Sequence, residues 1–263
     1  MNGTPEVVKD GPVRLESQEE GAIWRVVLNT PKANILDTEK LELLCEIFTD
    51  AAGARDLKAI VIEGEGPHFS FGASVPEHLP DKVEAMLHAF HQLFYRMLDA
   101  RVVTLCAVRG QCLGGAMELA IFCNRIFASP DAAMGQPEII LGVLAPVASV
   151  MLAERVGRSR AENLLLSGGS MNAAEGLAIG LVDELAEDPG EAALEYAREH
   201  LLPKSASSLR FAVQAARGGF AHRFRKELAE VERLFLDELM STSDAQEGLT
   251  SFLEKRDAEW KNA

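Results

Sequence analysis

The sequence predicts a fold of the α/β class, with a mainly helical segment towards the C-terminus. Two observations predict it. Apolar runs of strand length recur at residues 58–63 (KAIVIE), 102–108 and 125–128. Between these runs lie segments whose apolar residues repeat at helical spacing. This alternation is typical of a parallel sheet with right-handed crossover connections.

The first predicted element is a β-hairpin. Residues 13–18 and 22–28 are rich in β-branched and aromatic side chains, and the Glu-Glu-Gly stretch at 19–21 supplies the turn. After a loop, Asp37 or Thr38 is the expected N-cap of a helix. The apolar positions of this helix are Leu41, Leu44, Cys45, Ile47 and Phe48.

The middle of the chain continues the alternation. A glycine-punctuated loop is predicted over residues 64–74, and a helix over residues 83–98. The pair Gly114-Gly115 is expected to open a helix that ends near Phe122. Each of these segments lies between two of the predicted strands, as an α/β architecture requires.

The remainder is predicted to be helical after Pro146, apart from a short strand at residues 181–184. Residues 205–260 are predicted to form helices with charged outer faces. We therefore divide the chain into a core, residues 1–203, and a C-terminal helical region, residues 204–263.

The composition excludes some classes of partner. Lys and Arg total 26 against 40 Asp and Glu, and the net charge of −14 disfavours nucleic acid and anionic lipid surfaces. A polyanionic ligand such as coenzyme A would need a local site of backbone amides and a few cations. The N-terminus lacks the pattern of a signal peptide, and no apolar run reaches about 18 residues. We expect a cytoplasmic protein without a membrane span.

Metal binding is not expected. The cysteines lack CxxC spacing and lie in apolar surroundings, so buried thiols are favoured over a zinc site or disulfides. They are Cys45, Cys106, Cys112 and Cys123. His88 and His91 could share a helix face as ligands, but no nearby donors complete a site.

Three segments carry candidate chemistry: residues 68–74 (HFSFGAS), 110–118 (GQCLGGAME) and 134–138 (MGQPE). Glu118 falls one turn into an apolar helix, and Glu138 precedes an apolar run. Burial of a carboxylate is costly and raises its pKa towards the range useful for proton transfer. A structural salt bridge is the alternative for each glutamate, and a simple tight turn is the alternative for the glycines.

The backbone of these segments is expected to bind an anion. A glycine-rich turn into a helix leaves the first amides unpaired at the positive end of the helix dipole. With a second amide from the loop at Gly72 and Ala73, such a turn would hold a thioester oxygen and stabilise an enolate.

Together, FSFGAS, GQCLGGAMELA and MGQPEIILG resemble the signature segments of the crotonase (enoyl-CoA hydratase/isomerase) superfamily, in the same order, over residues 13–203. The resemblance implies a crotonase-like spiral of ββα units with a C-terminal helical region. It also implies an acyl-CoA substrate, no metal or redox cofactor, and assembly as a homotrimer or homohexamer.

The resemblance assigns roles position by position. The oxyanion hole falls on the amides of Ala73 and Gly115, and the catalytic pair of the hydratases on Glu118 and Glu138. Lys32 and Ala33 match a segment that contacts the nucleotide part of coenzyme A, although Lys32 could equally be a surface lysine. Further residues expected at the acyl-CoA site are Phe71, Gly72, Gly114 and Pro146.

Two departures from the common pattern of the family indicate which acyl-CoA substrate is expected. Ser74 stands where Asp is usual, and residues 144–149 (LAPVAS) replace a glycine-rich segment. Pro146 has no N–H with which to hold a water. Both departures resemble the cyclohexa-1,5-diene-1-carboxyl-CoA hydratases of anaerobic benzoyl-CoA degradation. That resemblance implies 1,4-addition of water to give 6-hydroxycyclohex-1-ene-1-carboxyl-CoA.

Within this interpretation Glu138 is the expected acid and Glu118 the expected base. Candidates for the pocket wall, with core packing as the alternative, are Phe69, Phe71, Met86, Leu87 and Phe90. A linear 2-enoyl-CoA hydratase or isomerase is the main alternative function. A non-catalytic scaffold of the same fold, which could be tested by RNA binding, is the alternative of a different class.

Overall fold

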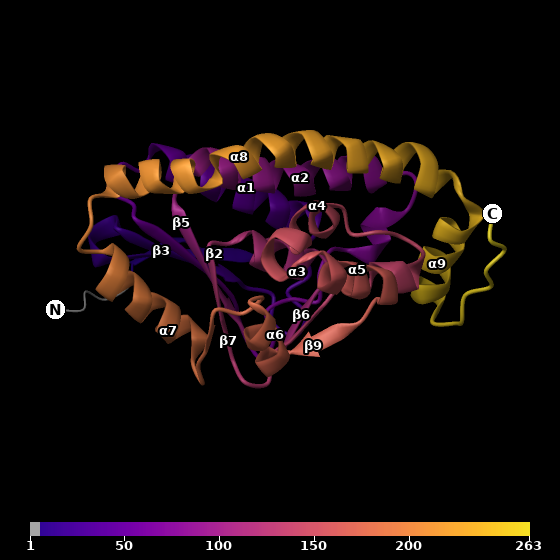
Figure 1. Cartoon of the computed structure of the whole chain (residues 1–263), viewed down its shortest axis with the longest axis horizontal. Coiled ribbons are helices and arrows are strands. Elements are labelled where there is room, and N and C mark those ends of the chain that lie inside the picture. Colours follow the sequence, from indigo (N-terminus) through magenta and orange to yellow (C-terminus); the bar gives the residue numbers. More distant parts are fainter. Residues whose placement is uncertain (1–5) are drawn as a thin grey trace.

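The fold is built on a seven-stranded sheet, seen in a computed structural model that describes residues 6–263 (Figure 1). The strand order is β1-β2-β3-β4-β5-β7-β10. These strands are β1 (Glu6–Lys9), β2 (Val13–Gln18), β3 (Ile23–Leu28), β4 (Ala59–Gly64), β5 (Val103–Val108), β7 (Arg125–Ala128) and β10 (Glu184–Leu185). From β3 to β10 every neighbouring pair is parallel, whereas β1, β2 and β3 pair antiparallel. The α/β class and the hairpin are confirmed.

The sheet is covered on both faces, which explains the continuous apolar runs of its central strands. In β4, Ile60 and Ile62 belong to the main hydrophobic core. The alternate residues Ala59 and Val61 belong to a second cluster, together with Leu194 of α7 (Pro189–Tyr196). Because successive side chains of a strand point to opposite faces, one short strand serves both cores.

Helices pack around this sheet and make up most of the remaining chain (Figure 1). They are α1 (Thr38–Gly53), α2 (Val83–Ala100), α3 (Gly115–Phe122), α4 (Pro146–Val156), α5 (Arg158–Ser167), α6 (Ala173–Ile179), α7 (Pro189–Tyr196), α8 (Ala206–Arg233) and α9 (Ser243–Glu254). Asp37 is the N-cap of α1, and its side chain accepts a hydrogen bond from the Lys40 amide. This capping agrees with the predicted start of that helix.

A second, three-stranded sheet was not predicted. It consists of β6 (Gln111–Leu113), β8 (Ala133–Gly135) and β9 (Ser170–Asn172), in the order β6-β8-β9. Strands of three residues are too short to show periodicity in a sequence. This sheet is important for the site, because β6 leads directly into α3 and β8 precedes Glu138.

The C-terminal region is helical, but less completely than predicted. The helix α8 packs along α2 and α4, and α9 ends at Glu254. The prediction of helix up to residue 260 is wrong, because residues 255–263 fold back onto the start of α9. There the side chain of Asp244 accepts hydrogen bonds from the amides of Lys261 and Asn262.

The strand predicted at residues 181–184 is also misplaced, since β10 is Glu184–Leu185. The domain boundary at residue 203 stays a prediction.

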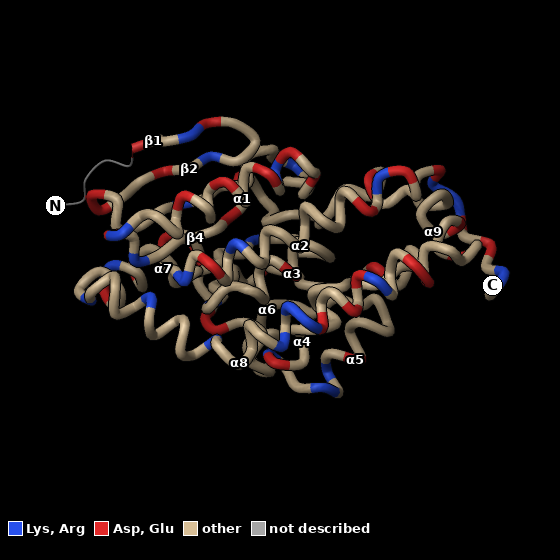
Figure 2. Tube along the Cα trace, turned by 90° about the horizontal axis from the view of Figure 1, so that it is seen from above, with Lys and Arg blue, Asp and Glu red and all other residues tan. Residues whose placement is uncertain are grey.

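Acidic and basic residues are interspersed along the exposed helices, as Figure 2 shows. Of the four cysteines, Cys106, Cys112 and Cys123 are buried free thiols, whereas Cys45 is only partly buried and the prediction for it is wrong. His91 is paired with Glu232. Within residues 6–263 we find no cluster of three metal-ligating side chains, and no helix there is long and apolar enough to cross a membrane.

Candidate active site

The site begins at the junction of β6 and α3. Gly114 is the N-cap of α3, with φ 55° and ψ −129°, and its own amide donates to the Gly135 carbonyl at 2.9 Å. This conformation requires glycine. The amide of Gly115 lies at the first position of the helix and has no acceptor among residues 6–263. It is therefore free to bind a ligand.

A second free amide lies beside the first. The loop after Phe71 is fixed by hydrogen bonds from Leu36 N to Gly72 O and from Ser74 N to Leu36 O, but Ala73 N has no acceptor in the described chain. Gly72 has φ +96°, and a side chain there would lie 2.6 Å from the Leu113 carbonyl oxygen. A Cβ on Gly115 would lie only 3.3 Å from the Ala73 Cβ. The two loops predicted to form an oxyanion hole are in contact.

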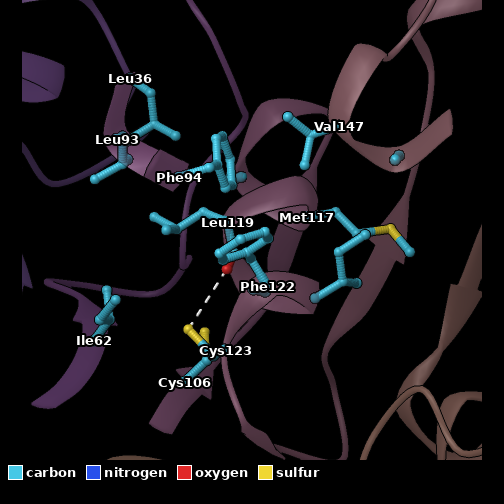
Figure 3. Close-up of a cluster of buried hydrophobic side chains, with 14 of the residues drawn as sticks. Leu36, Ile62, Leu93, Phe94, Cys106, Met117, Leu119, Phe122, Cys123 and Val147 are labelled. Carbon is cyan, nitrogen blue, oxygen red and sulfur yellow. Dashed lines mark hydrogen bonds between the residues drawn. The ribbon is translucent and has the colours of Figure 1, made fainter. Parts of the chain in front are cut away.

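Glu118 is buried in the core with the whole of α3. Figure 3 shows Leu119 and Phe122 of this helix packing with Phe94 of α2. The ring centroids of Phe94 and Phe122 are 4.9 Å apart. Within this apolar cluster the Glu118 side chain is 2% exposed. Removal of water from the carboxylate raises the pKa of Glu118 to about 7. Glu118 can therefore change its protonation state near neutral pH.

The start of α4 holds the Glu118 carboxylate. Pro146 occupies the first helical position, where its missing N–H costs no hydrogen bond. The next amides point back to α3, and Ala148 N donates to Glu118 Oε1 at 2.8 Å. The amides of Ala148 and Val147 stabilise the ionised form and oppose the rise in the Glu118 pKa. Within residues 6–263 the partners of Glu118 are these backbone amides and not a basic side chain, so a salt bridge does not explain its burial.

Glu138 begins a 3₁₀ turn, Glu138–Leu141, and its carboxyl group lies over Gly114. A Cβ added to Gly114 would lie 2.7 Å from Glu138 Oε1. With its amide nitrogen turned towards this carboxyl group, Gln136 donates to Oε1 at 3.1 Å and to Oε2 at 3.0 Å. Burial, and then the charge of Glu118, raise the pKa of Glu138 well above its ordinary range. The two carboxyl groups thus affect each other's titration.

An open cavity lies at this point, and its empty space of about 400 Å³ includes the solvent at its mouth. Its lining combines the two loops that present the Ala73 and Gly115 amides with Glu138 and a set of mostly apolar side chains. The lining residues are Phe71, Gly72, Ala73, Val75, His78, Gly114, Gly115, Pro137, Glu138, Leu141, Val143 and Leu249. A wider groove shares Phe71, Ala73 and Val75 with this cavity and extends to Ala33 and Ile35. Cavity and groove together suit a ligand with a long tail.

Of the remaining predicted residues, some line the cavity or the groove and others do not. Phe71 and Ala33 line the groove, and the Ala33 carbonyl accepts a hydrogen bond from the Phe71 amide at 2.9 Å. Lys32 is exposed and lines neither space, and Pro146 is buried in α4 away from both. Four of the candidate pocket walls pack in the main core, the alternative given for them: three lie on the buried face of α2, and the fourth points inward from the loop after β4. They are Phe69, Met86, Leu87 and Phe90.

Sequence reasoning missed three contributions to the site. His78 lines the cavity, and Gln136 holds Glu138. Helix α9 of the same chain places Leu249 in the cavity, and Phe252 and Leu253 in the groove. The signal for Gln136 was its position inside the MGQPE segment, and for His78 the unusual residues after Ser74. No local pattern connects α9 to a loop more than 100 residues earlier in the chain.

Substitution of Gly114 tests the packing of the site. Gly114→Ala is expected to lower the free energy of unfolding by on the order of 1–3 kcal/mol, because its conformation is strained for any other residue and the new methyl group meets the Glu138 carboxyl. Chemical denaturation measures this. Gly53→Ala is the matched control, since a Cβ there meets nothing within 4 Å. Equal stability of the two variants would contradict the described geometry.

Known proteins resemble this chain over nearly its full length. Residues 18–263 match the Enoyl-CoA hydratase/isomerase family. A cyclohexa-1,5-dienecarbonyl-CoA hydratase of Thauera aromatica is 51% identical over 251 residues, covering 95% of this chain and 97% of that protein. A 2,3-dehydroadipyl-CoA hydratase of Escherichia coli is 33% identical, covering 90% and 94% respectively.

A solved structure supports the fold. The crystal structure of an enoyl-CoA hydratase from Mycobacterium avium subsp. paratuberculosis superimposes with a TM-score of 0.84 at 23% identity, covering 96% of this chain and all of that one. The two sheets and the long C-terminal helices are thus those of the crotonase fold. On the family match and the sequence identities, the chain belongs to the crotonase (enoyl-CoA hydratase/isomerase) superfamily.

Proposed function

We propose that this protein adds water to cyclohexa-1,5-diene-1-carbonyl-CoA and forms 6-hydroxycyclohex-1-ene-1-carbonyl-CoA. The observation that carries the reaction class is a cavity lined by Glu138 and by the loops that present two free amides. Glu118 lies in the core one helical turn after Gly115 and does not line this cavity, but its charge acts on Glu138. The acyl group is taken from the Thauera aromatica relative, which is 51% identical over nearly the whole chain. The apolar lining of the cavity supports a hydrocarbon ring.

In the proposed mechanism the thioester oxygen accepts hydrogen bonds from the amides of Ala73 and Gly115. Negative charge develops on this oxygen when water attacks the β-carbon, and fixed donors stabilise it more strongly than the neutral carbonyl. The product of attack is a dienolate. Protonation of its far end moves the remaining double bond next to the thioester, so that one O–H bond of water breaks and one C–O and one C–H bond form.

The proton transfers are proposed to divide between the two glutamates. Two backbone amides stabilise the ionised form of Glu118, which supports its role as the base that takes a proton from water. The pKa of Glu138 is raised by burial and by the charge of Glu118, which supports its role as the protonated acid. Gln136 orients the Glu138 carboxyl group.

Coenzyme A is proposed to lie in the groove that leads away from the cavity. Ala33 lines this groove, and the exposed Lys32 beside it is available to a phosphate. This arrangement supports the contact with the nucleotide part that the resemblance implies. A backbone hydrogen bond joins Phe71 to Ala33. It connects the nucleotide end of the groove to the loop that presents the Ala73 amide.

A panel of acyl-CoA esters tests the function. We expect hydration of the cyclic dienoyl-CoA, seen by mass spectrometry as a gain of one water, with a higher kcat/KM than for linear crotonyl-CoA. A preference for crotonyl-CoA would replace the proposal with linear 2-enoyl-CoA hydration, the alternative that the E. coli relative favours. Absence of turnover on every ester would support a scaffold.

We also propose that the chain assembles as a homotrimer or homohexamer. Large apolar side chains at the surface support an interface, since monomers rarely expose such groups together. Ile139, Ile140 and Leu166 are exposed, and Ile140 lies against Gly168, at the end of the helix that carries Leu166. Light scattering distinguishes the two assemblies by mass.

A further inference from the structure

Among residues 6–263, His78 and Glu138 are the two polar side chains in the lining of the cavity described above. It ends the 3₁₀ turn Val75–His78, directly after the loop that presents the Ala73 amide. Val75, Leu141, Val143 and Leu249 supply apolar lining around it. A polar atom in such surroundings needs a partner, which is water in the empty cavity and a polar group of the ligand once the ligand displaces that water.

The hydrogen bonding of His78 fixes its tautomer. Nδ1 lies 2.9 Å from the carbonyl oxygen of Ser74. Because a carbonyl oxygen only accepts, Nδ1 must carry the hydrogen. Burial lowers the pKa of His78, which keeps the ring neutral. Nε2 therefore presents a lone pair. Among the hydrogen bonds of residues 6–263 His78 takes part only through Nδ1, and Nε2 is not sealed from solvent, so water or a ligand can donate to it.

The proposed reaction supplies one matching donor. The ring of the dienoyl substrate is a hydrocarbon without a hydrogen-bond donor, whereas the hydroxylated product carries one O–H group. We infer that Nε2 of His78 accepts a hydrogen bond from this hydroxyl group, and from the water that becomes it. His78 is then a specificity-determining residue for the position at which water is added. This inference rests on the proposed function and extends it to a residue outside the glutamate pair.

Two ligands that differ by one hydroxyl group isolate this contact. They are 6-hydroxycyclohex-1-ene-1-carbonyl-CoA and cyclohex-1-ene-1-carbonyl-CoA, and titration calorimetry gives a Kd for each. The measurements use a Glu138→Gln background, which slows conversion of the hydroxylated ligand during the titration, and the ligand recovered afterwards is checked by mass spectrometry. Turnover of the cyclic dienoyl-CoA by the wild-type enzyme is measured first, and its absence would overturn the proposed function and this inference together.

His78→Asn is the informative variant. The Asn amide nitrogen stands near the position of Nδ1 and still donates to the Ser74 carbonyl, whereas nothing replaces Nε2. We expect the variant to bind the hydroxylated ligand roughly 2–10-fold more weakly, the effect of one neutral hydrogen bond. The ligand without the hydroxyl group should bind as before, which also shows that the cavity is intact.

His78→Phe separates the contact from the support of the loop. It removes both nitrogens and the bond to Ser74, so we expect the same hydroxyl-dependent loss together with a weakening common to both ligands. Equal weakening of both ligands in His78→Asn would overturn the inference and assign His78 a purely structural role. Unchanged binding of both ligands to His78→Asn would overturn it as well.

Discussion

Replacement of Glu138 by Gln is expected to lower kcat for hydration by on the order of 10²–10⁴-fold, the contribution of a positioned acid or base. The Glu138 carboxyl group borders the cavity beside the Gly115 amide, and burial keeps it protonated. Gln fills the same space and retains hydrogen bonding but cannot deliver a proton. Steady-state kinetics with the cyclic dienoyl-CoA measures the loss, and calorimetry with the hydroxylated product should show that binding persists.

The matched control for this variant is Glu162→Gln. Glu162 is a partly exposed glutamate of α5 that is paired with Arg158, so its substitution should leave kcat within about twofold of wild type, as for most surface changes. If Glu138→Gln retained nearly wild-type hydration, Glu138 would not be the proton donor. A loss of acyl-CoA binding equal to the loss of activity would assign it to binding instead.

Glu118→Gln is expected to cause a comparable loss of kcat and also to change how stability depends on pH. The pKa of Glu118 rises from 4.5 to about 7 on folding, so the folded protein holds this proton more strongly than the unfolded chain. The resulting stability is complete below pH 4.5 and is lost as the pH rises through 7. Relative to the variant, the wild-type enzyme should lose up to about 3 kcal/mol of unfolding free energy over this range.

Denaturant titrations at several pH values, with kinetics at neutral pH, measure both effects. Loss of the Glu118 charge also lowers the pKa of Glu138, so the comparison reports the titration of Glu118 together with its effect on Glu138. Glu195→Gln, at an exposed position of α7, is the control for loss of one carboxylate. A variant with full activity, or one with the same pH dependence as wild type, would show that Glu118 is not a buried titrating base.

The local features of the fold could be predicted because short segments determine them. The apolar run at residues 58–63 marks a strand covered on both faces, and Asp37 caps a helix through its own side chain. The glycine pair at 114–115 could be placed at a helix start because it combines a residue with positive φ and a free first amide. These properties depend on neighbours within a few residues.

Features set by distant contacts could not be predicted in this way. The strand β8 has three residues, and it forms between β6 and β9, with Gly135 packed closely against Ser170. Helix α9, near the C-terminal end of the sequence, supplies Leu249 to a cavity whose loops lie more than 100 residues earlier. Phe69 and Phe71 belong to one loop, yet the first is in the core and the second lines the groove. Residues two apart in a regular strand point to the same side, so the irregular backbone of this loop separates the two rings.

The electrostatic roles of the glutamates likewise depended on the three-dimensional structure. The sequence placed Glu118 in an apolar helix but could not distinguish an acid–base residue from half of a salt bridge. The amides of Val147 and Ala148, which come from a helix 30 residues away, provide its partners instead. The proline that removes one donor in this segment also starts the helix that supplies these two.

A crystal structure of the Glu138→Gln enzyme with cyclohexa-1,5-diene-1-carbonyl-CoA tests the central claim most directly. We expect the thioester oxygen about 3 Å from the amide nitrogens of both Ala73 and Gly115, the distance of an ordinary hydrogen bond. The ring should lie beside residue 138, with coenzyme A along the groove at Ala33. A thioester oxygen out of reach of both amides, or a ring bound outside this cavity, would contradict the account.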